Sequence, residues 1–138
     1  MQTTILTPML ALIVWTFVMW FWMYATRIPA MQAAGLDPKL VKRKGDLEKL
    51  PTSVQQIADN YNHLHEQPTL FYALLLYSHL VGVADSLNIE LAWAYVAIRC
   101  VHSLIQATSN FVPVRFSVFV LGSLVLMVIA GRNLAALF

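Results

Sequence analysis

Charged side chains are scarce in this chain. Asp, Glu, Lys and Arg make up 12% of the 138 residues, whereas 59% of the residues are apolar. Soluble domains usually carry about 25% charged residues. No charge occurs before Arg27. The composition excludes an ordinary soluble protein and favours one domain that is surrounded by lipid.

Cysteine and a strong net charge are also lacking. Cys100 is the only cysteine, which excludes an intrachain disulfide and a cysteine-based metal site. The net charge of +2 and the absence of a basic patch with aromatic residues give no indication of nucleic-acid binding. The uncharged N-terminal run has neither the basic start nor the clear cleavage site of a secretory signal. We therefore expect this run to be a retained first membrane span.

Four apolar stretches approach the length of about 20 residues that a bilayer requires. They predict an all-α integral membrane protein, a single domain over residues 1–138 that forms a four-transmembrane-helix bundle. The expected spans cover about residues 4–25, 52–84, 87–110 and 114–135, with a polar connector at 27–50. Pro68 lacks a backbone N–H and is expected to kink the second helix.

Lysine and arginine are concentrated in the connector. Six of the nine lie there: Arg27, Lys39, Lys42, Arg43, Lys44 and Lys49. The positive-inside rule then puts the connector in the cytoplasm and both termini outside. The short connections between spans favour a bacterial inner membrane.

Two of the expected spans each carry a polar stripe. The stripe of the second span consists of Gln55, Asp59, Asn62, His63 and Glu66, and that of the third of Arg99, His102, Ser103, Gln106 and Asn110. Each stripe covers a helical sector of about 100°. A charge within a span costs roughly 3 kcal/mol unless it faces protein or water. We expect the stripes to face each other in the cytoplasmic half, either as a structural Glu66–Arg99 ion pair or as a binding site.

The segment RCVHSLIQATSNFVPVR, from Arg99 to Arg115, resembles the third-to-fourth-span segment of the MAPEG proteins, membrane enzymes of eicosanoid and glutathione metabolism. The shared features are Arg-x-x-His, a polar residue four positions further on, and Pro-x-Arg. The upstream segment ADNYNHLHEQPTLF resembles the second-span motif of the family. The resemblance implies a divergent prokaryotic member that forms a homotrimer and holds glutathione between neighbouring subunits, near the cytoplasmic face.

The resemblance also implies roles for individual residues. Arg115 matches the arginine that stabilises the glutathione thiolate, which makes it the expected catalytic residue, since a nearby cation favours a thiolate. Glu66, Arg99 and Arg27 match positions that bind the tripeptide. The remaining expected cofactor-binding residues are His102 and three departures from the family pattern: Asp59, His63 and Gln106, where the family has Arg, Asn and Tyr.

Two functions follow from these residues. The first is a glutathione-dependent transferase or peroxidase that acts on a lipophilic electrophile from the bilayer. The second is a non-catalytic MAPEG-like trimer that binds a lipid or an anionic metabolite, as the departures at Asp59, His63 and Gln106 suggest. A metal site built from Asp59, His63, Glu66 and His102 has suitable ligand types, but two helices seldom complete such a site, and we expect no metal.

Overall fold

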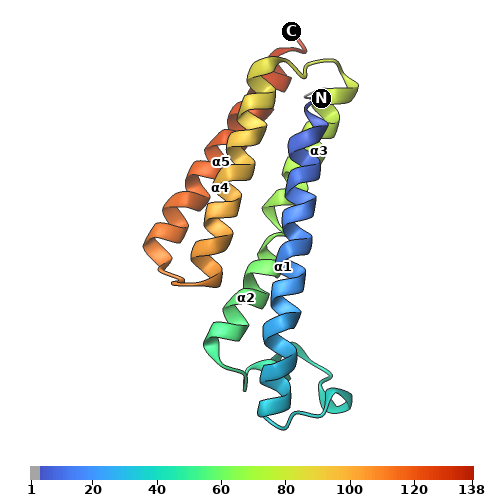
Figure 1. The fold of residues 1–138 in the computed structure, drawn as a ribbon. Helices are drawn as coiled ribbons and strands as arrows, with labels where there is room; N and C mark the ends of the chain where they lie inside the picture. Colours follow the sequence, from blue (N-terminus) through green and yellow to red (C-terminus); the bar gives the residue numbers. More distant parts are fainter. Residues whose placement is uncertain (1–3) are drawn as a thin grey trace.

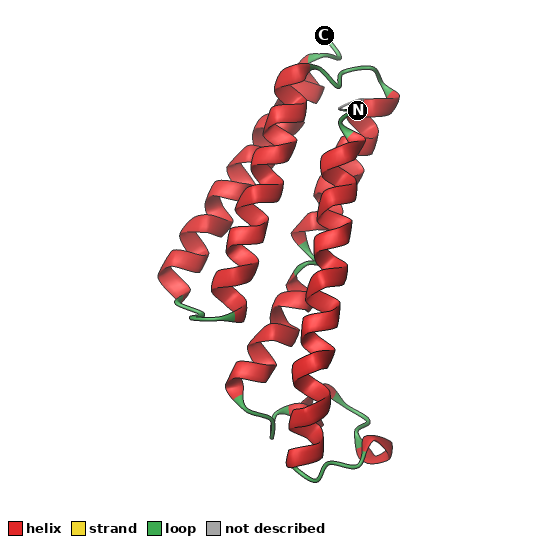
Figure 2. Cartoon of the chain, viewed as in Figure 1, coloured by secondary structure: helices red, strands yellow, loops and turns green. Residues whose placement is uncertain are grey.

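The computed structural model describes residues 4–138, and the regular structure in this range is helical (Figures 1 and 2). The helices are α1 (Leu6–Ala33), α2 (Thr52–His63), α3 (Gln67–Leu80), α4 (Ser86–Ala107) and α5 (Val112–Ala135), with two short 3-10 turns, η1 (Pro38–Leu40) and η2 (Lys44–Leu47). The all-α class is confirmed. Residues 1–3 of the expected domain lie outside the described part.

The helices run up and down along one long axis. Figure 1 shows the start of α1 and the end of α5 at one end of the bundle and the connector after α1 at the other. α2 and α3 follow each other along α1, and α4 packs along α5. The α4–α5 turn points towards the connector but ends short of it, so α1 and α2 project further than the hairpin formed by α4 and α5.

α1 is longer than the span that the sequence indicated. It continues past residue 25, through Arg27 and Pro29, into the stretch expected to be connector. The helix ends at Ala33, and Gly35, two residues later, has a φ of 66°, in the left-handed region that favours glycine. Arg27 therefore sits on a helix, where its direction is fixed by the helical repeat.

The second expected span is broken, not kinked. α2 ends at His63 and α3 begins at Gln67, while Glu66 has φ −97° and ψ −98°, outside the helical region. Pro68 has no N–H to donate, and its ring clashes with the carbonyl four residues earlier, that of Leu64. The expectation of one kinked helix over 52–84 is wrong, and the break changes the direction in which Glu66 points.

Among residues 4–138, two helices have the length and apolar character to cross a membrane, α1 and α5. Their most apolar windows are only 22% and 17% buried within the described chain. Large apolar side chains such as Phe17, Phe21 and Met127 remain exposed along them. Apolar surface of this extent on long helices indicates contact with lipid or with another chain, and it points to a membrane protein.

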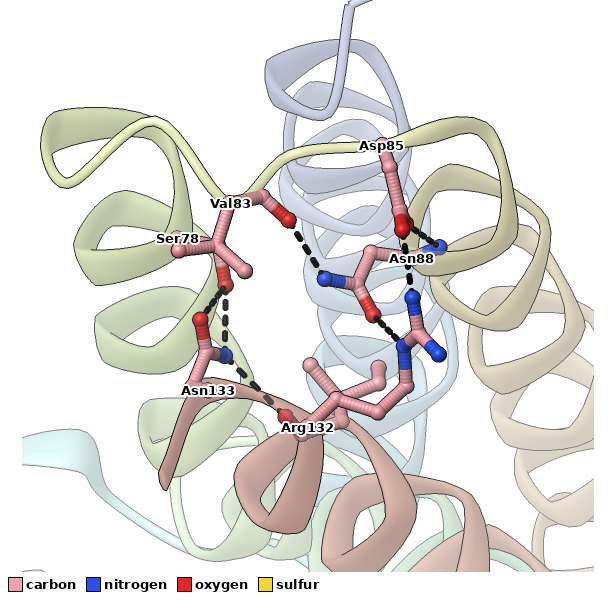
Figure 3. Close-up of polar contacts among 7 residues, drawn as sticks. Ser78, Val83, Asp85, Asn88, Arg132 and Asn133 are labelled. Atoms are coloured by element: carbon pink, nitrogen blue, oxygen red, sulfur yellow. Dashed lines mark hydrogen bonds and ion pairs between the residues drawn. The ribbon is translucent and has the colours of Figure 1, made fainter. Parts of the chain in front are cut away.

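A polar cluster joins α3, α4 and α5 at the end of the bundle near the termini (Figure 3). Its members are Ser78, Val83, Asp85, Asn88, Arg132 and Asn133. Ser78 and Asn133 bond each other through their side chains in the buried interior, at 2.7 and 3.1 Å. Arg132 donates to Asn88 Oδ1 at 2.8 Å and to the Asp85 carboxylate. Because these bonds cross three helices, the cluster fixes how the α4–α5 hairpin meets α3.

Candidate functional site

A cavity of about 200 Å³ lies where the end of α2 faces α4 and the start of α5. We call it the arginine pocket. Its lining residues are His63, His102, Gln106, Val112, Arg115, Phe116 and Phe119. The lining contains hydrogen-bond donors and apolar rings and has no Asp or Glu. A cavity of this kind is suited to a negatively charged group.

Arg99 lies directly behind the arginine pocket and is 2% exposed. Its Nη2 donates to His63 Nδ1 at 2.6 Å. Because a guanidinium has only donors, His63 Nδ1 must accept, and the imidazole is the neutral form with its proton on Nε2. Within the part of the chain that the structure describes, no carboxylate lies within 4.0 Å of the Arg99 guanidinium. The positive charge is therefore desolvated without a directly paired anion.

His63 and His102 form one wall of the arginine pocket. Their rings stack with centroids 5.1 Å apart and planes at 22°, and Phe119 packs against both rings at 5.6 and 6.2 Å. His102 Nδ1 and Gln106 Oε1 are buried without a hydrogen-bond partner among residues 4–138. Unpaired buried polar atoms cost about 1–3 kcal/mol each, and functional sites are a usual reason for them.

Arg115 is held in place by the turn between α4 and α5. Its guanidinium donates to Asn110 Oδ1. Asn110 has φ 50°, a left-handed conformation that asparagine tolerates better than most residues, and its backbone N–H bonds to Ile105 O at 2.7 Å. Sequence reasoning placed Asn110 on the polar stripe but missed this role. An Asn two residues before a Val-Pro helix start is the signal that could have found it.

A second cavity of about 370 Å³ lies between the end of α1, η2 and α2. We call it the connector pocket. Its lining residues are Arg27, Lys44, Leu47, Glu48, Gln55, Ala58, Asp59 and Asn62. Lys44 Nζ lies 3.9 Å from Asp59 Oδ1, and both side chains are exposed. Lys44 and Glu48 are members of this pocket that the sequence analysis did not select.

The structure therefore divides the predicted site residues. His63, His102, Gln106 and Arg115 line the arginine pocket, whereas Arg27 and Asp59 line the connector pocket. The division arises because the polar stripe on α2 is wide. Asp59, at one edge, faces α1 and η2, whereas His63, at the other edge, faces α4 and α5.

Glu66 belongs to neither cavity lining. Its side chain is 68% exposed, and its Oε2 lies 3.6 Å from His63 Nε2, longer than a hydrogen bond. The expected Glu66–Arg99 ion pair is not formed, because the helix break moves Glu66 off the stripe and His63 takes its place beside Arg99.

The metal alternative finds no support in the arrangement of these side chains. Among residues 4–138, no group of three or more His, Cys, Asp or Glu side chains is placed to hold an ion. Asp59 and His102 lie in different cavities, so the four proposed ligands do not converge.

The comparisons with known proteins agree with the geometry. A family model described as the MAPEG family matches residues 5–135, nearly the whole chain. No curated protein and no solved structure matches the chain. The match includes both segments on which the sequence resemblance was based and the two long apolar helices. The chain belongs to the MAPEG family, and it is a membrane protein.

Proposed function

We propose that this protein is a membrane glutathione-dependent transferase or peroxidase whose substrate is a lipophilic electrophile. The observation that carries the proposal is the arginine pocket: Arg115 lines it, Arg99 lies behind it, and no acidic side chain contributes to its wall. Membership in the MAPEG family supports glutathione as the anionic ligand.

The chemistry follows from the position of Arg115. When the glutathione thiol loses its proton to water, the thiolate sulfur lies near the guanidinium, which stabilises the negative charge and raises the fraction of reactive nucleophile. In the transferase reaction the thiolate sulfur forms a bond to an electrophilic carbon, and the bond from that carbon to its leaving group, such as chloride, breaks. In the peroxidase reaction the sulfur bonds to one oxygen of the hydroperoxide, the O–O bond breaks and the alcohol leaves, and a second glutathione converts the resulting sulfenic acid into glutathione disulfide and water. Phe116 and Phe119 supply an apolar wall that accommodates a lipophilic partner and positions it beside the sulfur.

The size of the pocket supports a trimer. Ligand pockets usually measure about 300–1,000 Å³, and the arginine pocket measures about 200 Å³. The thiol end of glutathione fits in such a volume, and the remainder extends onto a neighbouring subunit in the proposed homotrimer. In this arrangement all four spans cross a bacterial inner membrane, with the connector in the cytoplasm, both termini outside, and lipid around the exposed faces.

Conjugation of 1-chloro-2,4-dinitrobenzene and reduction of cumene hydroperoxide, both with glutathione, test the proposal. Arg115→Gln should lower either activity at least tenfold, since a hydrogen bond to a charged group contributes about 1.5–3 kcal/mol. Arg43→Gln is the matched control, because Arg43 is exposed on the connector and its replacement removes the same charge. Equal activity in the two variants would show that Arg115 does not stabilise the thiolate.

A second candidate function is a non-catalytic trimer that binds a lipid or an anionic metabolite. It is favoured by His63, whose Nδ1 is already occupied by Arg99, and by Asp59, whose carboxylate lines the connector pocket and counts against glutathione, a tripeptide with two carboxylates of its own. The arginine pocket, which Asp59 does not line, would then hold the other anion. Saturable binding of an anion without turnover of either electrophile would support this candidate over the enzyme.

A further inference from the structure

A third cavity, of about 240 Å³, lies between α1 and the break that separates α2 from α3. We call it the aromatic pocket. Its lining residues are Ile13, Thr16, Phe17, Trp20, Tyr61, Leu64, His65, Thr69 and Tyr72. It shares no lining residue with the arginine pocket or the connector pocket. The proposed glutathione chemistry makes no use of it.

The break between α2 and α3 places polar groups at this cavity. Where Pro68 interrupts the helix, His65 and Thr69 come to line one side of it, opposite α1. By its place in the sequence His65 falls outside the polar stripe, which predicts a packing or surface residue and no part in a site. Its position beside the break, in a stretch expected to cross the membrane, is what gives it an accessible ring.

The hydrogen bonds within the chain leave this cavity with acceptors. His65 Nδ1 lies 2.9 Å from the Tyr61 carbonyl oxygen, which can only accept, so the proton is on Nδ1 and the neutral ring offers Nε2 as an acceptor. The Thr69 hydroxyl donates to Glu66 O at 2.7 Å, and the Thr16 hydroxyl donates to Leu12 O at 2.9 Å. Both hydroxyl oxygens keep lone pairs for a ligand. Trp20 adds an indole N–H, and the hydroxyl groups of Tyr61 and Tyr72 can donate or accept. A ligand that uses both the acceptors and the donors of this wall carries a group that does both, such as a hydroxyl.

The rest of the wall determines the shape and charge of that ligand. Four aromatic side chains surround the cavity, Phe17, Trp20, Tyr61 and Tyr72, and no Asp, Glu, Lys or Arg lines it. Aromatic rings favour offset or edge contacts with another ring, and the absence of charge favours a neutral molecule. Residues 13–20 lie well inside the first expected span, so the ligand reaches the cavity from the lipid.

We propose that the aromatic pocket binds a neutral aromatic lipophile that carries a hydroxyl donor, a molecule of the phenol class. The arginine pocket offers a cation to an anion, whereas the aromatic pocket offers uncharged acceptors and donors to an uncharged O–H group. The two sites therefore favour ligands of different charge, and this proposal stands whether or not glutathione binds.

Photolabelling of the full chain in phospholipid nanodiscs tests the proposal. The probe is 4-hydroxybenzophenone, and its methyl ether, 4-methoxybenzophenone, is the matched compound without a donor. Peptide mass spectrometry locates the labels after irradiation. We expect saturable labelling of residues 13–20 and 61–72 by the phenol, with at least fivefold higher apparent affinity than the ether, because one neutral hydrogen bond contributes about 1 kcal/mol.

Variants separate the hydrogen bond from simple partition into lipid. Thr69→Val keeps the shape of the side chain, removes one acceptor, and should reduce the apparent affinity for the phenol severalfold without changing labelling by the ether. Thr108→Val is the matched control, since the Thr108 hydroxyl also donates to its own helix, at Leu104 O, but lies outside the aromatic pocket. Arg115→Gln should leave the labelling unchanged, which separates this site from the proposed glutathione site.

Two results would overturn the proposal. Equal, non-saturable labelling by both probes along the lipid-facing sides of α1 and α5 would mean that the compounds only dissolve in the bilayer. The second result is that neither probe labels either segment, while a Phe17→Cys variant forms disulfide cross-links between neighbouring subunits. This result would mean that a second copy of the chain fills the cavity.

Discussion

Replacing His63 with phenylalanine removes the acceptor of the Arg99 guanidinium and preserves a flat ring that can stack on His102. The hydrogen bond is 2.6 Å long, and Arg99 is 2% exposed. The added ring volume has room in the adjoining cavity of about 200 Å³. The variant therefore isolates one interaction, the bond between a buried cation and a neutral imidazole.

The expected loss of stability is about 2 kcal/mol. Hydrogen bonds to charged groups contribute about 1.5–3 kcal/mol, and no carboxylate within 4.0 Å takes over the Arg99 charge in the described chain. Arg99→Met alone should be close to neutral, because it removes the hydrogen bond to His63 and the desolvation penalty of the buried charge together. In the Arg99→Met background, His63→Phe should change the free energy of unfolding very little, because the hydrogen bond is already absent.

A double-mutant cycle measures this coupling. Unfolding of the detergent-solubilised protein by increasing mole fractions of dodecyl sulfate, followed by circular dichroism, gives the free energy of unfolding of the four proteins. The predicted interaction energy between Arg99 and His63 is about 2 kcal/mol. The loss of unfolding free energy caused by His63→Phe is compared between the wild-type and Arg99→Met backgrounds. If the two losses agree to within about 0.5 kcal/mol, the usual limit of additivity, His63 is not the partner of Arg99.

Three further variants test other parts of the account. Asn110→Gly should keep the left-handed turn but weaken glutathione binding, because the bond to Arg115 is lost. Asn110→Ala should lose the same bond and also about 1 kcal/mol of unfolding free energy, because alanine is strained in the left-handed conformation. Equal stability of the two variants would contradict a strained turn. Ser78→Ala should cost about 1–3 kcal/mol because the buried Asn133 amide loses its partner, with glutathione affinity unchanged, and a neutral thermal shift would argue against the polar cluster. Gly122→Ala should leave the melting temperature nearly unchanged, since an added Cβ lies 3.4 Å or more from its neighbours. Gly122→Leu should force α5 away from α4 and lower the melting temperature. An unchanged melting temperature in the leucine variant would show that the two helices pack less closely.

Much of the architecture follows directly from the sequence. Apolar run lengths predicted the all-helical class and placed α4 and α5 close to their observed bounds. The Pro-x-Arg segment located Arg115 correctly at a helix start, and it identified the family that the comparison then showed. These predictions succeed because run length and a short motif are local properties, which can be recognised within one stretch of the sequence.

The details of the site could not be derived in the same way. The expected pairing of Glu66 with Arg99 assumed a continuous second helix, and the three residues of the break altered both the rotation and the direction of the Glu66 side chain. The backbone angles of these three residues decide whether Glu66 or His63 lies beside Arg99. Periodicity also could not show that Asp59 and His63 face different cavities, because both fit one 100° stripe.

The polar cluster near the termini was missed for a related reason. Asn133 and Ser78 are 55 positions apart, and each alone resembles an isolated polar residue in an apolar run. Their pairing becomes visible only when α3 and α5 are seen side by side. A comparison of how far each residue lies from the end of its helix could have suggested it, since Ser78 and Asn133 both lie near the C-terminal ends of their helices.

Calorimetric titration of the purified wild-type protein with glutathione, beside the Arg115→Gln and Arg43→Gln variants, tests the central claim most directly. The account predicts saturable binding by the wild-type protein and by Arg43→Gln, and affinity at least tenfold weaker for Arg115→Gln. Absence of binding by the wild-type protein at millimolar glutathione, or equal affinity in all three proteins, would contradict the assignment of the arginine pocket as the glutathione site.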